Sequence, residues 1–132
     1  MYRTIKEDFG FEVTLNGKLS LDQMKQWRFE TIRVMVGTGE NFSVLFDFRE
    51  LRPGELEPEV QQLLSDGWRL FKREGMLRSC VILDNRKAAL QYKRRALTSV
   101  DYFYERYIDA STDPEWRKKA IGWLADKTEP GK

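Results

Sequence analysis

The chain has 132 residues, enough for one domain with its own core, and its 41% hydrophobic and 33% charged residues are typical of a globular protein. Its net charge of +2 gives no general attraction to polyanions, so nucleic acid is not an expected partner. It has no histidine and one cysteine, which excludes Ser-His and Cys-His catalysis, histidine-ligated zinc and an intramolecular disulfide. Without a long apolar run or a leader-like start, no transmembrane segment is predicted and the cytoplasm is the expected location.

The first predicted elements are two short strands in an antiparallel hairpin. Residues 3–7 and 11–15 are strand-like runs, and the second alternates apolar and polar side chains. A helix follows, because Ser20 and Gln23 have the spacing of a capping box. Gly37 is the predicted end of this helix, since glycine readily adopts the left-handed conformation of a helix terminus.

Residues 42–48 predict a strand that is buried on both faces. The run Phe42-Ser43-Val44-Leu45-Phe46-Asp47-Phe48 is almost entirely apolar and is bounded by glycine on one side and by Pro53-Gly54 on the other. We expect Val44 and Phe46 to be almost fully buried between two layers of helices.

The second half of the chain alternates helices and strands. Pro58 fits the first position of a helix whose apolar residues recur every three or four positions as far as Phe71. The apolar run 76–83 predicts a strand, and Asp84-Asn85 predicts the cap of a further helix that would contain Tyr92 and Ala96. Residues 105–109 predict a last strand, and residues 112–115 open a final helix.

These elements predict a single-domain α/β sandwich with the order β-β-α-β-α-β-α-β-α. The expected sheet is mixed, has four or five strands and begins with the N-terminal hairpin. The domain is expected over residues 1–127, with residues 128–132 as a disordered tail. The single Cys80 lies in a strand-like run, where a free cysteine usually acts as a small buried hydrophobe.

Four segments of the sequence resemble STAS domains, which have the fold of the anti-sigma-factor antagonist SpoIIAA. They are the helix entry from Leu19 to Met24, the strand end Val44-Leu45-Phe46-Asp47-Phe48-Arg49, the segment Arg78-Ser79-Cys80-Val81-Ile82-Leu83-Asp84-Asn85, and the close Glu105-Arg106-Tyr107-Ile108-Asp109 with Gly122-Trp123-Leu124. The resemblance implies a SpoIIAA-like fold and a non-enzymatic regulatory or protein-interaction module.

The chain departs from that family at the position of the regulatory serine. Anti-sigma-factor antagonists carry a phosphorylatable serine at the start of the helix after the central strand, whereas no Ser or Thr lies between Ser43 and Ser65 here. We therefore expect a protein partner whose binding is not switched by serine phosphorylation.

Charged and polar side chains follow the ends of two predicted strands and mark the candidate ligand or partner surface. In open α/β sheets, ligands bind beyond the carboxyl ends of the parallel strands. An anion or an acidic protein loop is expected there. The alternative is that these residues only cap helices and close a salt bridge. The predicted surface comprises Asp47, Arg49, Arg52, Asp84, Asn85 and Lys87.

Two other function classes stay open. One is a carrier or sensor of a small apolar or anionic ligand, and the other is an enzyme that uses carboxylate, lysine or tyrosine chemistry. No catalytic residue, cofactor or metal site is predicted from residue spacing, and a homodimer is left open. Two basic groups, at residues 86–95 and 117–119, are interpreted as solvated helix faces, and contact with an anionic ligand, nucleic acid or a membrane surface is the alternative.

Overall fold

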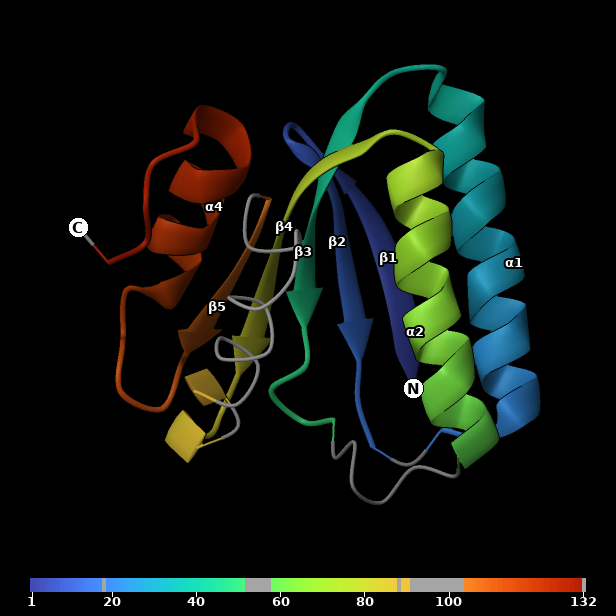
Figure 1. Ribbon diagram of the computed structural model, residues 1–132, viewed down its shortest axis with the longest axis horizontal. Helices are drawn as coiled ribbons and strands as arrows, with labels where there is room; N and C mark the ends of the chain where they lie inside the picture. Colours follow the sequence, from blue (N-terminus) through green and yellow to red (C-terminus); the bar gives the residue numbers. More distant parts are fainter. Residues whose placement is uncertain (18, 52–57, 88, 91–103, 132) are drawn as a thin grey trace.

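Five strands form one mixed sheet with the spatial order β1-β2-β3-β4-β5 (Figure 1). This computed structural model describes residues 1–17, 19–51, 58–87, 89–90 and 104–131. β1 and β2 form an antiparallel hairpin, and β2 to β5 run parallel to one another. The predicted mixed sheet with an N-terminal hairpin is thus confirmed. The strands are β1 (Tyr2–Glu7), β2 (Gly10–Leu15), β3 (Phe42–Asp47), β4 (Met76–Leu83) and β5 (Glu105–Asp109).

Helices cover both faces of this sheet. Figure 1 shows α1 (Leu21–Thr38) and α2 (Pro58–Arg73) side by side on one face and α4 (Trp116–Asp126) on the other. Residues 86, 87, 89 and 90 are also helical, but the rest of the helix predicted after Asn85, including Tyr92 and Ala96, lies outside the described residues. Among the helices that the structure describes, none has the length and apolar character needed to cross a membrane.

The start of α1 follows the sequence signal, but its end does not. The Gln23 amide donates to Ser20 Oγ at 3.2 Å and the Ser20 amide donates to Gln23 Oε1 at 2.9 Å, which completes the predicted capping box. Gly37 lies inside the helix, so the predicted end there is wrong. The Thr38 hydroxyl donates to the Met35 carbonyl at 2.8 Å, and Gly39, with φ of 64°, is the left-handed cap.

Two hydrophobic cores lie on opposite faces of the sheet and share β3. Val44 and Phe46, both 0% exposed as predicted, belong to the larger core under α1 and α2. Leu45 belongs to the smaller core under α4, together with Cys80 and Trp123. Successive side chains of a strand point to opposite faces, so a strand between two cores must be apolar at nearly every position. This explains the continuous apolar run of residues 42–48.

The tryptophans are distributed over these layers. Trp27 of α1 and Trp123 of α4 are buried in the larger and the smaller core, respectively. Trp68 and Trp116 are partly buried and pack against the larger and the smaller core, respectively. The final helix begins at Trp116, and Glu115 is its N-cap. A turn precedes the helix, in which the Glu115 amide donates to Asp113 Oδ1. Residues 128–131 follow α4 without helix or strand.

Candidate functional site

Asp47 ends β3 and forms a close ion pair with Arg49. Arg49 donates from Nε to Asp47 Oδ1 and from Nη2 to Asp47 Oδ2, both at 2.9 Å, and its amide donates to Oδ1 at 3.2 Å. The Asp47 side chain is only 10% exposed, whereas that of Arg49 is 42% exposed. The hydrogen bonds to Asp47 raise the pKa of Arg49. The salt bridge that the sequence allowed as an alternative is therefore present.

Arg49 also connects the end of β3 to the start of α4. Its guanidinium lies 4.5 Å from the centroid of the Trp116 ring, within the range of a cation–π interaction. Trp116 is the first residue of α4. The loop after β3 and the first turn of α4 are thus held together by a charged group over an aromatic face.

A second bidentate ion pair lies next to the first. Arg117 donates from Nη1 and Nη2 to the two carboxylate oxygens of Glu12, each at 2.8 Å. The Glu12 side chain is 11% exposed and that of Arg117 is 46% exposed. The hydrogen bonds from Arg117 lower the pKa of Glu12, while burial and the negative charge of Asp47 oppose that shift.

The parallel register of β2 and β3 explains why the two pairs meet. Glu12 lies opposite Leu45 and Thr14 lies opposite Asp47, so Glu12 and Asp47 project from the same face of the sheet, two positions apart. That face is the one covered by α4. We call Glu12, Asp47, Arg49, Trp116 and Arg117 the strand-end charge cluster.

The other predicted site residues lie around this cluster or outside the described part of the chain. Asp84 is exposed after β4, and its negative charge contributes to the raised pKa of Arg49. Asn85 accepts the Ala89 amide with its carbonyl at 3.0 Å, which starts the next helical turn, and Lys87 is exposed there. Arg52 lies outside the described residues.

Sequence reasoning missed Glu12, Trp116 and Arg117. In the sequence, Glu12 has the pattern of an outward polar residue in an edge hairpin. Arg117 belongs to a basic group that is interpreted as a solvated helix face. Arg117 is exposed, as that interpretation expects, but it also binds Glu12, and Lys119 donates to Asp113 at 2.8 Å. Glu12 and Arg117 are 105 positions apart in the chain, so no local pattern signals their pairing.

A separate polar cluster lies on the opposite face of the sheet, around Glu105. This carboxylate is 4% exposed and accepts hydrogen bonds from Trp68 Nε1 at 2.5 Å, Ser79 Oγ at 3.1 Å and the Tyr107 hydroxyl at 2.8 Å. The Trp68 ring stacks on Phe46 with centroids 4.1 Å apart. Glu105 therefore ties α2 to β4 and β5.

Two findings bear on metal and thiol chemistry. In the part of the chain that the structure describes, no group of three or more Asp, Glu, Cys or His side chains is arranged to hold a metal ion. Burial, followed by the nearby charge of Glu105, raises the pKa of the Cys80 thiol. A buried thiol with a raised pKa is a poor nucleophile, so Cys80 acts as a core residue.

Comparison with known proteins identifies the fold. No protein-family model and no curated protein sequence matches the chain. A crystal structure of an uncharacterised protein of the DUF3478 family from Shewanella loihica PV-4, described as having a SpoIIAA-like fold, matches with a TM-score of 0.63 and 14% sequence identity. The match covers 95% of this chain and 93% of that one. The protein therefore has the SpoIIAA-like fold that its resemblance to STAS domains implied.

Proposed function

We propose that this protein is a non-enzymatic protein-binding module whose acidic partner docks on the strand-end charge cluster. The observation that carries the proposal is the direction of the charges. The guanidinium side chains of Arg49 and Arg117 are 42% and 46% exposed, while the carboxylates that orient them are about 10% exposed. The cluster thus presents its cations outward and keeps its anions behind them.

This arrangement suits recognition of carboxylates. A guanidinium offers five donors, and its bidentate bond to Asp47 or Glu12 leaves further N–H groups for an incoming acidic side chain. Trp116 adds an aromatic surface next to Arg49, and aromatic and arginine side chains are enriched at protein interfaces. The strand-end position also matches the place where open α/β sheets bind their ligands.

The same geometry disfavours acid–base catalysis at this site. A general acid needs a pKa near the working pH, but Arg117 lowers the pKa of Glu12. Glu12 is therefore ionised at neutral pH and already accepts two strong hydrogen bonds. A binding role, without a serine switch in residues 44–64, fits these observations better than an enzymatic one.

Site-specific photocrosslinking in the protein's own host tests the proposal. A benzophenone amino acid at exposed Glu50, beside the cluster, should give a covalent adduct with a discrete partner. The matched position is Gln26, exposed on α1 on the other side of the sheet, which should give none. Asp47→Asn combined with Arg49→Gln should abolish the adduct, and added salt should weaken it, because exposed charges are screened.

The double substitution removes both charges and keeps hydrogen-bonding groups, so the fold should survive. The melting temperature of the double variant serves as the control for folding. Adducts of equal yield at Glu50 and Gln26, or adducts that persist in the folded double variant, would place the partner surface elsewhere.

A carrier or sensor of a small ligand is the second candidate function. The observation that favours it is a cavity of about 620 Å³ beside β5, at the other edge of the sheet from the hairpin. Ligand pockets commonly have volumes of roughly 300–1,000 Å³.

A further inference from the structure

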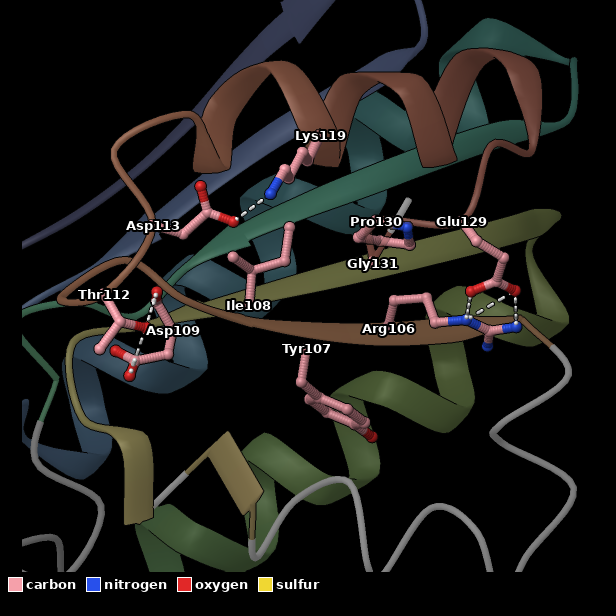
Figure 2. Close-up of a pocket in the computed structure, with 10 residues that line it drawn as sticks. All are labelled: Arg106, Tyr107, Ile108, Asp109, Thr112, Asp113, Lys119, Glu129, Pro130 and Gly131. Carbon is pink, nitrogen blue, oxygen red and sulfur yellow. Dashed lines mark hydrogen bonds and ion pairs between the residues drawn. The ribbon is translucent and has the colours of Figure 1, made fainter.

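The cavity beside β5 lies between that strand, the loop that leads into α4, and the residues that follow α4. Figure 2 shows Arg106 and Glu129 at one end, Asp113 and Lys119 at the other, and Ile108 between them. The two ends are therefore charged and the middle is apolar. None of these residues belongs to the strand-end charge cluster.

The Trp123 ring and the Glu105 carbonyl hold Arg106 in position. Its guanidinium lies 4.1 Å from the centroid of the buried Trp123 ring, and its Nη1 donates to the Glu105 carbonyl at 2.9 Å. The Arg106 side chain is only 12% exposed. Its Nε and Nη2 are thereby turned together toward Glu129, which is the geometry with which arginine binds planar carboxylates and phosphates.

Glu129 fills this position with its carboxylate. Arg106 Nε lies 2.9 Å from Oε2 and 3.2 Å from Oε1, and Nη2 lies 2.6 Å from Oε1. Glu129 belongs to residues 128–131, which have no helix or strand, and its side chain is 39% exposed. A rigid arginine thus meets a carboxylate on a segment without regular structure.

We propose that this cavity binds a small organic anion, whose carboxylate or phosphate group takes the place of the Glu129 carboxylate on Arg106. The apolar body of the ligand would lie along Ile108 and Pro130 in the middle of the cavity. Lys119, which pairs with Asp113 at 2.8 Å, supplies a second cation at the far end. Glu129 acts as an internal competitor for the site.

The competition has a measurable consequence. If Glu129 occupies Arg106 for about 90% of the time, the apparent Kd of an external anion is about tenfold weaker than its intrinsic value. Removing the Glu129 charge should therefore strengthen binding, whereas a purely structural ion pair would give no such gain. This difference separates a ligand site from a salt bridge that only holds the segment in place.

The experiment titrates the whole chain with two probes, sodium hexanoate and phenyl phosphate. Isothermal titration calorimetry and tryptophan fluorescence measure the binding of each probe. Glu129→Gln should bind at least one probe about tenfold more tightly than wild type. Adding Arg106→Gln to Glu129→Gln should remove that binding. Glu115→Gln, an exposed N-cap residue of α4 that makes no side-chain cap bond, is the matched control for the change in net charge and should bind like wild type.

The relative affinities of the two probes assign the ligand class. Preference for hexanoate indicates a carboxylic acid, and preference for phenyl phosphate indicates a phosphate monoester. The proposal is overturned if Glu129→Gln binds neither probe more tightly than Glu115→Gln does. It is also overturned if binding survives Arg106→Gln in protein that far-UV circular dichroism shows to be folded.

Discussion

Gly10 occupies the most restricted backbone position among the described glycines. Its φ is 144°, and a Cβ placed there would lie 2.1 Å from the carbonyl oxygen of Ser43. Gly10 begins β2, and Ser43 is its partner on β3. The hairpin can therefore enter the sheet beside β3 only where the side chain is a hydrogen atom.

Gly10→Ala should lower the free energy of unfolding by at least ~3 kcal/mol, because both the backbone conformation and the close contact become unfavourable. Urea denaturation measures the change. Gly37→Ala is the matched control, since Gly37 lies inside α1 and a Cβ at that position would meet no atom within 4 Å. It should leave stability unchanged or raise it by about 0.5–1 kcal/mol. A Gly10→Ala variant as stable as wild type would contradict this account.

Residue-scale prediction from sequence worked where partners are close in the chain. Asp47 and Arg49 are two positions apart, so their salt bridge could be anticipated from the end of one strand. The pairing of Glu12 with Arg117 depends on how α4 crosses the sheet, and no local pattern of residues encodes that crossing. The same holds for Trp68 and Glu105, which are 37 positions apart.

At the scale of elements, α4 is a short helix that is fixed at both ends. It has 11 residues, too few for stability in isolation. Arg117 binds Glu12 near its start, and Arg78 donates to the carbonyls of Trp123 and Leu124 near its end, both at 2.9 Å. These bonds satisfy carbonyls in the last turn and orient the helix on the sheet.

The Glu12–Arg117 pair should make the attachment of α4 depend on pH. The folded-state pKa of Glu12 is lowered, so its contribution is fully present above the ordinary value of 4.5 and is lost as the pH falls through the folded-state pKa. Arg117→Gln should therefore cost about 1–2 kcal/mol at pH 7, a value limited by solvent screening of the exposed guanidinium. The cost should shrink progressively below pH 4.5.

Urea denaturation of wild type and Arg117→Gln between pH 7 and pH 3 measures this difference. Lys118→Gln is the control, because Lys118 is exposed on the same helix and has the same charge. A difference between wild type and Arg117→Gln that stays constant across this range would show that the Glu12 carboxylate does not stabilise the fold.

Sequence periodicity predicted the elements better than their ends. The apolar runs that became β3 and β4 are visible because both faces of these strands are buried. The end of α1 was missed because two glycines lie close together, and the left-handed cap is the second of them, Gly39, rather than Gly37. Residues 128–131 have the composition of a tail, yet Glu129 is bound to Arg106, a contact that depends on tertiary structure.

At the scale of the whole molecule, the two cores share the strand β3, whose side chains pack alternately into one core and the other. Phe46 packs against Trp68 in the α1–α2 layer, and its neighbour Leu45 packs in the α4 layer. Each layer therefore needs the same strand in place. This sharing predicts that the two helical layers unfold together, as expected for a small domain with cooperative unfolding.

Leu45→Ala tests this coupling from the smaller core. Leu45 is 0% exposed, so its truncation should cost about 2–5 kcal/mol. Because β3 is shared, α1 and α4 should lose hydrogen-exchange protection at the same urea concentration, and the variant should shift both midpoints equally. Leu77→Ala, at a leucine of β4 that is 47% exposed, should change stability by less than about 0.5 kcal/mol. If α4 loses protection in Leu45→Ala while α1 keeps its wild-type midpoint, the two layers are independent folding units and the shared strand does not couple them.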